Sequence, residues 1–465
     1  MVRSGNSSGL RKPRPRAALA FVLGMGALAA VPLVVSAALR THSLLVVHDP
    51  GIRGGPADAG GPIPGLNSQE MTTFNDGSAN FTTAFAVPQG LGPRFDENQC
   101  SSCHIQPAAG GSGPASPATN PLFNVYTLNG ATNSMPSFET MTGPILVPRF
   151  PYMADLKTPD GTVHQLFTIT GRSDASGCNI QQPDFSQAQS QGNLAYHQPL
   201  PTFGDGLVEF IENSTLTTNM STVCASQSTY GICGTASISG HDGSVNRLGW
   251  KAQWRGLNLA AGEELNVQQG VTNEYFPAEL DQTTGCDFNP VPESATNFNP
   301  NIAEDQFTGD PERMAIFMRF LAPPVPAQFN SHATNGQTQF SAVGCQLCHT
   351  VSFTTPSSPF VFMSQKTIKL YSDLLLHHMG PCLADNVVAG MAQGDMFRTP
   401  PLWGAGKRMF FLHDGRTSDL LAAIQDHYCV SNSQYPASEA NTVIDSFNAL
   451  SPQNQQDLLF FIRDL

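Results

Sequence analysis

Two copies of the pentad C-x-x-C-H set the strongest limit on what this 465-residue chain can fold into. Two thiols at this spacing can add to the two vinyl groups of a haem, while the neighbouring imidazole binds its iron. The sequence therefore predicts two covalently bound haem c groups. The predicted attachment residues are Cys100, Cys103, His104, Cys345, Cys348 and His349.

Two other readings of a C-x-x-C pair fit the sequence less well. Zinc would need further ligands grouped at zinc spacings, and none accompanies either pentad. A thioredoxin-like redox pair would need an alternating strand–helix–strand setting, which the pattern does not indicate. No remaining cysteine stands in an evidently electropositive setting, so thiol chemistry is not predicted.

The N-terminus is predicted to be a targeting segment. Five basic residues lie within the first 16, and residues 17–39 then carry no charge. This apolar run reaches the roughly 20 residues that span a bilayer, although small residues near Ala37 could also serve a signal peptidase. The positive-inside rule places everything after Arg40 outside the cytoplasm. We expect a protein of the periplasm or of the outer face of the inner membrane, with membrane contact only through residues 17–39.

Charge and composition exclude one class of partner and indicate a loop-rich chain. The net charge of −13 argues against nucleic acid binding, which needs a basic surface. An acidic surface fits plain solubility or a basic protein partner. Gly and Pro together number 78, which favours extensive loops.

Six cysteines remain outside the pentads, and in an exported chain they predict three disulfides. Cys224 and Cys233 are close enough to close one loop. For the other four cysteines we favour Cys382 with Cys429 and Cys178 with Cys286. Other pairings stay open, because the sequence does not choose among them.

Organisation along the chain predicts a mainly α fold with extensive loops and two cytochrome c-like haem lobes. Residues 1–40 are the signal peptide or anchor, and residues 41–66 are a Gly/Pro-rich linker or arm. Residues 67–325 form the N-terminal haem lobe, with large irregular insertions, and residues 326–465 form the C-terminal lobe. Apart from the pentads, no internal repeat is evident.

Three helices are well marked. One begins near Asp310 as N-cap and presents Met314, Phe317, Met318 and Leu321 on one face before it ends at Pro323. A second follows Thr417-Ser418-Asp419 and carries Leu420, Ile424 and His427 on one face. The last opens at Ser451-Pro452 and turns Leu458, Phe461, Ile462 and Leu465 inward.

The second axial ligand of each iron decides what the haem can do. For the second haem His427 is the first candidate, because it lies on the apolar face of its helix, and His377, His378 and His413 compete with it. For the first haem no histidine occurs between His104 and His164, and Met135, Met141 and Met153 are the nearby soft ligands. An open or water-occupied position is therefore expected there.

Seven sequence blocks resemble the di-haem oxidoreductase family related to the bacterial di-haem cytochrome c peroxidases. They span roughly residues 50–465 and read GPIPGLNSQEMTTFNDG, GLGPRFDENQCSSCHIQPAAGG, DGLVEFI, NRLGWKAQ, VGCQLCH, YSDLLLHHMG and FRTPPLWGAGKRMFFLHDGRTSDLLAAIQDH.

The resemblance implies roles for the two haems. In the peroxidases a segment similar to residues 397–427 wraps the electron-donating haem, and its ligand, usually Met, occupies the place that His427 holds here. This implies His349/His427 coordination and a lower potential than a His/Met pair would give. The peroxidases also carry a detachable His after the first pentad, which this chain lacks. The first haem would then face the substrate.

Four further residues are candidates near the haems. Glu209 in DGLVEFI is the candidate acid or base for peroxide chemistry, with Gln253 as its hydrogen-bonding neighbour. Trp250 is a candidate electron relay between the haems, although a lone Trp is more often core. Arg398 could pair with a haem propionate, although a structural ion pair is as common.

We therefore expect an exported di-haem oxidoreductase of peroxidase type. Electrons would come from a small cytochrome or cupredoxin, and the oxidant would be peroxide or another small molecule. The alternative is an electron-transfer cytochrome with two six-coordinate haems. A third possibility is a maturation enzyme that oxidises tryptophans in a partner protein, as one relative does.

Overall fold

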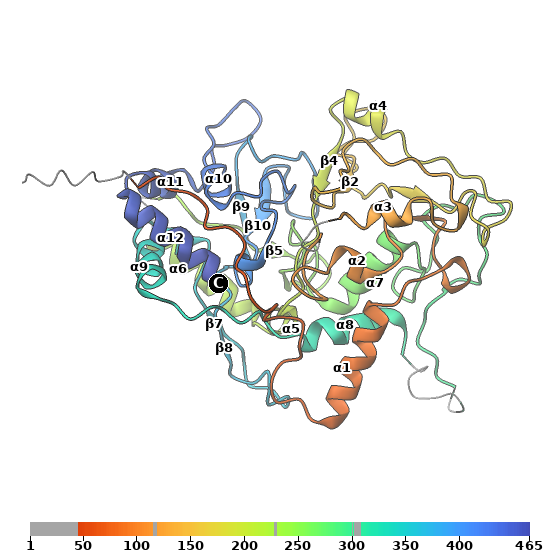
Figure 1. Ribbon diagram of the computed structural model, residues 1–465, viewed down its shortest axis with the longest axis horizontal. Coiled ribbons are helices and arrows are strands. Elements are labelled where there is room, and N and C mark those ends of the chain that lie inside the picture. The colour runs from red at the N-terminus through yellow and green to blue at the C-terminus, as the bar shows by residue number, and fades with distance from the viewer. Residues whose placement is uncertain (1–44, 115–118, 227–229, 300, 302–307) are drawn as a thin grey trace, which may run out of the picture. The chain divides into compact units, whose positions relative to one another are not determined.

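The computed structural model describes residues 45–465 except 115–118, 227–229, 300 and 302–307. Residues 45–465 form one compact unit (Figure 1). The predicted signal or anchor over residues 1–40 lies outside the described residues. Among the described residues, no helix is long and apolar enough to cross a membrane.

Helices and loops dominate the described part of the chain, as the sequence predicts, and the strands are short. The helices are α1 (Ser68–Phe81), α2 (Cys100–Cys103), α3 (Leu122–Val125), α4 (Phe185–Ser190), α5 (Asp205–Glu209), α6 (Asn213–Ser226), α7 (Leu257–Gln269), α8 (Asp310–Phe320), α9 (Ser331–Ala342), α10 (Leu420–Gln425), α11 (Asn441–Asn448) and α12 (Pro452–Asp464).

Strands pair only in antiparallel two-stranded ladders within the described residues. The ladders are β1 (Arg94–Phe95) with β3 (Phe167–Thr168), β2 (Val147–Arg149) with β4 (Ala195–His197), β5 (Ser237–Ile238) with β6 (Val245–Asn246), β7 (Phe353–Thr354) with β8 (Thr367–Ile368), and β9 (Leu376–His378) with β10 (Met396–Arg398).

The three helices predicted from the sequence are all present. α8 begins at Asp310, but its N-cap is Gly309 rather than Asp310. Asp419 caps α10 by accepting hydrogen bonds from the second and third backbone N–H groups of the helix, and α10 ends at Gln425, two residues before His427. α12 follows its Ser451 cap, and its predicted inward residues are buried.

The helices α1 and α8 pack across each other (Figure 1). Their closest approach lies at a glycine of α1. A Cβ on Gly77 of α1 would lie 2.5 Å from the carbonyl oxygen of Arg313, so only glycine lets the two backbones approach this closely. Phe81, one turn after Gly77, packs against Phe317 of α8 with 4.8 Å between ring centroids. The ring of Phe81 also lies 6.1 Å from that of His104.

The helices α9 and α12 repeat this arrangement. A Cβ on Gly336 of α9 would collide with the carbonyl oxygen of Asp457 in α12. Phe340, again four residues after the glycine, packs against Phe461 with 5.4 Å between centroids and lies 6.2 Å from the ring of His349. The structure thus contains a repeated helix crossing beside each pentad, although the sequence shows no repeat beyond the pentads.

Two hydrophobic clusters form the main interior of the described residues. The larger one holds mostly residues before 322, but it also includes Phe362, Leu374 and Trp403. The smaller one surrounds α9, α10 and α12, and it includes Ile232 from the earlier part of the chain. Each cluster contains side chains from both sides of residue 325. The division into lobes at 325/326 therefore stays a prediction.

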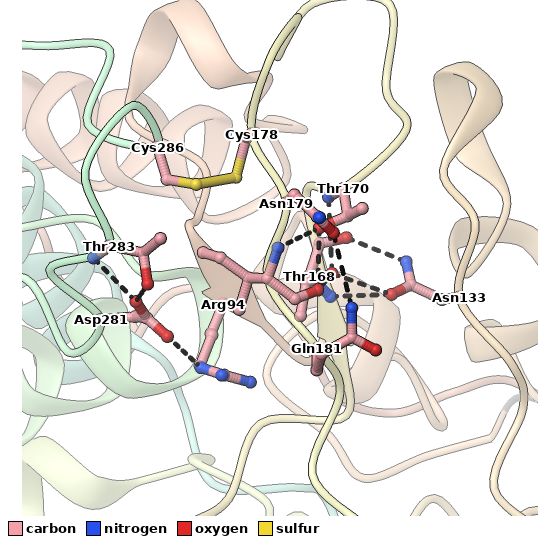
Figure 2. Close-up of a disulfide and its surroundings, with 11 residues drawn as sticks. Arg94, Asn133, Thr168, Thr170, Cys178, Asn179, Gln181, Asp281, Thr283 and Cys286 are labelled. Carbon is pink, nitrogen blue, oxygen red and sulfur yellow. Dashed lines mark hydrogen bonds and ion pairs between the residues drawn. A yellow bond between two sulfur atoms is a disulfide. The ribbon is translucent and has the colours of Figure 1, made fainter.

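All three favoured disulfides are present. They join Cys178 to Cys286, Cys224 to Cys233, and Cys382 to Cys429. Figure 2 shows the first of them, close to an ion pair of 2.8 Å between Arg94 and Asp281. Together these links tie the loop that follows α7 to the segment around β1 and β3.

Residues 45–66, part of the predicted linker or arm, lie along the folded chain without regular secondary structure. Asp49 forms an ion pair with Arg463 in α12. The backbone of Arg53 donates to Gly406, and that of Ile63 donates to Phe320 in α8. The arm therefore binds to elements from both predicted lobes.

Candidate haem cavities

The first pentad forms the short helix α2, with both thiols free. The Nδ1 atom of His104 lies 3.0 Å from the carbonyl oxygen of Gly111. This contact fixes the imidazole as the Nδ1–H tautomer, a pattern usual for histidines that bind metals. The backbone of Leu200, which also lines the cavity beside this pentad, is a second hydrogen-bond acceptor for the ring. Burial lowers the pKa of His104, which keeps the ring neutral.

The second pentad repeats this geometry. Its cysteines are free, and Nδ1 of His349 lies 3.0 Å from the carbonyl oxygen of Tyr371. Burial lowers the pKa of His349 to about 4. Burial likewise raises the pKa of the Cys100 and Cys345 thiols to about 12, so neither forms a thiolate at neutral pH.

A cavity of about 190 Å³, the N-terminal cavity, opens beside the first pentad. Helix α7 lines it with Leu257, Ala260, Ala261, Glu264 and Gln268, which share one face of the helix by their spacing. The small side chains of the two alanines leave room above the helix. Further lining comes from α8 through Met314 and Met318, and from β2 and β4 through Val147, Arg149 and His197.

A second cavity of about 190 Å³, the C-terminal cavity, opens beside the second pentad. His349 and His427 both line it, together with Phe340 of α9 and Leu458 of α12. The Nδ1 atom of His427 lies 2.7 Å from the carbonyl oxygen of Ala423, so its Nε2 is left free. The sequence predicts His427 on the inner face of its helix, and in the structure His427 lines the cavity two residues beyond the end of α10.

The competing histidines are bound to acidic side chains or packed in aromatic contacts. His377 lies 2.9 Å from both Asp373 and Glu439, and His378 lies 2.9 Å from Asp395. His413 stacks on Phe397 with 4.1 Å between ring centroids. Of these three, His377 and His413 line the C-terminal cavity. Neither has an Nδ1 held by a backbone carbonyl as His349 and His427 do, so His427 remains the best candidate ligand.

Both cavities are mainly apolar but are also lined by guanidinium groups. Arg398 lines both, Arg149 lines the N-terminal cavity, and Arg408 lines the C-terminal one. The Nε of Arg149 is buried without a hydrogen-bond partner. Among the described residues, the Arg398 guanidinium donates only to the carbonyl oxygens of Gly249 and Thr399. A flat apolar cofactor that bears carboxylates would meet this need, and haem with its propionates is such a group.

The wall between the cavities contains Trp250 and Arg398, since both residues line both cavities. The indole Nε1 of Trp250 donates to the carbonyl oxygen of Gln198 at 2.8 Å. The backbone of Arg398 donates to the carbonyl oxygen of Trp250 at 2.8 Å. The two sequence candidates are therefore neighbours at the contact between the cavities.

The structure does not bring Glu209 to either cavity. Its carboxylate forms an ion pair with Arg319 at 2.7 Å and accepts a hydrogen bond from the backbone of Leu257 at the start of α7. Gln253 does line the N-terminal cavity, but its Oε1 accepts from the backbone of Lys251 rather than from Glu209. Glu209 thus has a structural position that fixes α5, α7 and α8 to one another.

Three carboxyls that the sequence reasoning missed line the N-terminal cavity, namely Glu97, Asp205 and Glu264. Burial raises the pKa of each to about 7. Glu264 could have been found from the helical spacing of Leu257, Ala260, Ala261 and Glu264. Nothing in the local sequence distinguishes Glu97 or Asp205 from surface residues.

Possible second ligands at the first pentad are few. Met141 and Met153 are exposed, and neither they nor Met135 line the N-terminal cavity. Met314 lies at the pentad cysteines, with its sulfur 3.8 Å from Sγ of Cys100. His197 lines the cavity, but its Nε2 lies 2.8 Å from Asp385. No group of three or more His, Cys, Asp or Glu in the described residues could hold a metal ion by itself.

Two cavities, each with a free cysteine pair and a fixed imidazole, are typical of a di-haem protein. A family model described as "Di-haem oxidoreductase, putative peroxidase" matches residues 156–465, which is more than half of the chain. The chain therefore belongs to this di-haem oxidoreductase family. The match includes the second pentad and leaves the first one outside.

The chain is similar over part of its length to two solved structures. A MauG-like protein associated with microbial copper homeostasis is 14% identical, with a TM-score of 0.28 over 55% of this chain and 89% of that protein. The hydrazine synthase of Kuenenia stuttgartiensis, pressurised with xenon, is 17% identical, with a TM-score of 0.23 over 36% of this chain. The chain spans 56% of that hydrazine synthase chain. No curated protein sequence matches the chain significantly.

Proposed function

We propose that the protein is an exported di-haem c-type cytochrome of peroxidase type, with one haem attached at each pentad. In this proposal electrons enter at the C-terminal site from a small cytochrome or cupredoxin. A small oxidant such as peroxide reacts at the N-terminal site. The acidic net charge makes a basic donor protein the better partner.

One observation carries this proposal: the two cavities differ in their free imidazoles. The C-terminal cavity holds two histidines, His349 and His427, each with Nδ1 on a backbone carbonyl and Nε2 free. In the N-terminal cavity one histidine, His104, has Nδ1 on a backbone carbonyl. A site with two nitrogen ligands suits electron transfer, whereas a site with one leaves room for an oxidant.

The remaining residues suit the division of roles. When bound, the haems would supply iron that exchanges electrons and, at an open position, binds a small oxidant. Arg149, Arg398 and Arg408 would hold the propionates, and the apolar lining would exclude water. Glu264, unlike Glu209, lines the N-terminal cavity, and burial raises its pKa to about 7. Trp250 would lie between the cofactors.

A second function is favoured by one observation. His197 also lines the N-terminal cavity, and if it turned a ring nitrogen to the iron, both haems would be six-coordinate. The protein would then be an electron carrier without chemistry of its own. Location outside the cytoplasm is common to both functions.

Mass spectrometry and spectroscopy of the protein, made in cells that mature c-type cytochromes, test the proposal. We expect a mass equal to the polypeptide plus two haems and an electron paramagnetic resonance spectrum with one high-spin and one low-spin ferric signal. Two low-spin signals that do not respond to peroxide would favour the electron carrier. A mass without haem, or no Soret band, would contradict both functions.

A further inference from the structure

A fully buried lysine lies behind the wall between the two cavities. The side chain of Lys251 has no exposed surface, and its Nζ lies 2.8 Å from Oδ1 of Asp385. The same Nζ donates to the carbonyl oxygens of Met396 at 3.0 Å and Gln393 at 3.3 Å. It also lies 3.8 Å from the centroid of the Phe397 ring. All three ammonium protons are used, so Lys251 is a fixed positive charge.

Asp385 is held as an anion by this lysine. Burial alone would raise the pKa of Asp385, but Lys251 and the hydrogen bond from His197 lower it to about 2. Oδ1 also accepts a hydrogen bond from the backbone of Val387 at 2.9 Å. Oδ2 therefore remains as the acceptor for His197, whose Nε2 lies 2.8 Å away.

This pairing fixes the tautomer of His197. Since Asp385 is an anion, Nε2 must carry the proton, and Nδ1 keeps its lone pair. Within the described part of the chain, Nδ1 has no hydrogen-bond partner. The ring lies at the end of β4, opposite Val147 of β2, and both residues line the N-terminal cavity. The lining of the cavity thus includes a histidine with a hydrogen-bond acceptor that the described residues do not use.

The charges that face His197 keep it neutral at rest. Burial, Arg149 and Lys251 lower its pKa to about 4, against the opposing effect of Asp385. His413, whose ring centroid lies 5.8 Å away, is neutral as well, because burial lowers its pKa to about 3. A neutral imidazole with a buried carboxylate behind it is the arrangement that accepts a proton in many hydrolases.

We propose that His197 accepts the proton of a small neutral acid that enters the N-terminal cavity, and that Lys251 and Asp385 position its imidazole. The acid H–X loses its proton to Nδ1, the electron pair of the H–X bond stays on X, and nothing is oxidised. The imidazolium is then balanced by Asp385, which lies on its other side. The inference rests on the proposed function, because the haem iron would hold the anion X.

Hydrogen cyanide, a small neutral acid that binds open ferric haem, is the probe. Its association with the purified di-haem protein is followed by the Soret shift from pH 3.5 to pH 8. If His197 is the acceptor, the rate constant is flat above about pH 5 and falls below about pH 4, where His197 becomes protonated. If Glu264 is the acceptor instead, the rate falls as the pH drops through about 7, and that result would overturn the inference.

A substitution gives the second test. His197→Gln keeps a donor for Asp385 but removes the acceptor, and we expect association to slow by roughly 10²-fold with unchanged haem content. His241→Gln, at an exposed position, is the matched control and should leave the rate unchanged. An unchanged rate in His197→Gln would overturn this inference but would leave the proposed function standing.

Two further outcomes separate this inference from the proposed function. If the unaltered protein binds no cyanide, the open iron position is wrong, and the inference falls with the proposed function. If His197→Gln instead converts a low-spin haem to high spin, His197 is an iron ligand rather than a proton acceptor. If the variant does not fold, the pH profile of the unaltered protein still decides.

Discussion

At the scale of single residues, His427 shows how a short helix aims a ligand. Asp419 caps α10, and the helix then delivers Ala423, whose carbonyl oxygen holds Nδ1 of His427 at 2.7 Å. The cap and the apolar side chains could be predicted from the sequence, and so could the inward direction of the ring. The carbonyl contact could not, because it arises only once α10 ends at Gln425.

Replacement of this histidine tests its role at the second haem. His427→Met should keep the covalent haem and the low-spin signal but raise the potential of that haem, within the roughly 0.8 V range that axial ligands set. Spectroelectrochemical titration measures the shift. His241→Met, exposed and remote in sequence from both pentads, is the control. Equal potentials in the variant and the unaltered protein would show that another residue binds this iron.

The buried side chain of Asp96 destabilises the folded state when its carboxyl group is ionised. It is 2% exposed, and burial raises its pKa from 3.8 to about 8. One carboxylate oxygen accepts from the backbone of Leu166 at 2.6 Å, and the other is buried without a partner. The folded state therefore binds a proton here that the unfolded state releases above about pH 4.

The expected result is a stability that falls with rising pH. This contribution is full below pH 3.8 and is lost as the pH rises to about 8, with a slope of up to about 1.4 kcal/mol per pH unit. Asp96→Asn should flatten that slope in guanidinium titrations between pH 4 and pH 8. Asp76→Asn, which is exposed on α1, should follow the unaltered protein. A parallel slope in Asp96→Asn would mean that other buried carboxyls cause the dependence.

At the scale of elements, the two glycine crossings explain why each pentad lies where it does. Each crossing places a phenylalanine about 6 Å from the pentad histidine, which is Phe81 at His104 and Phe340 at His349. The sequence predicts α8 and α12 from their caps and apolar faces. It does not reveal that α1 packs on α8 and α9 on α12. The apolar faces of α1 and α9 are narrow, and a glycine within a segment normally argues against a helix there.

Gly336→Ala should therefore destabilise the protein even though alanine favours a helix. The new Cβ would meet the backbone of Asp457 and the Cβ of Phe461, neither of which can turn aside. We expect a loss of about 1–3 kcal/mol in the free energy of unfolding, measured by guanidinium titration. Gly240→Ala has open space around its Cβ and should be neutral or better. No loss at Gly336 would mean that the helices cross at a greater distance.

At the scale of the whole molecule, the contacts that the sequence fails to predict are mainly those between residues distant in the chain. The three disulfides are the favoured pairs, since cysteines are few and a chain predicted to be exported is expected to pair them. For the wall between the cavities, the sequence predicts Trp250 as an electron relay and Arg398 as a propionate partner, but it does not predict that the two residues are neighbours. Lys251, Asp385 and His197 come from three distant segments, and no local pattern marks them as one group.

The position of the arm over residues 45–66 also depends on contacts with residues that are distant in the sequence. Gly and Pro indicate an extended segment, but they do not say whether it is free or bound. The structure shows Asp49 paired with Arg463 through two oxygens, with side chains that are 9% and 3% exposed. Asp49 also accepts from the backbone of Leu420, at the start of the helix that leads to His427.

Asp49→Ala should accordingly affect both stability and the second haem. Arg463 would be left buried without its partner, which costs about 3 kcal/mol in the free energy of unfolding. Limited proteolysis should then cut residues 45–66 before the rest of the protein unfolds. Asp58→Ala removes the looser pair with Arg53, 3.9 Å apart and more exposed, and should cost less than about 1 kcal/mol.

Because Asp49 holds the start of α10, its loss should also broaden the low-spin signal assigned to His427, whereas Asp58→Ala should leave it sharp. Equal stability and equal spectra in the two variants would show that the arm is only laid on the surface.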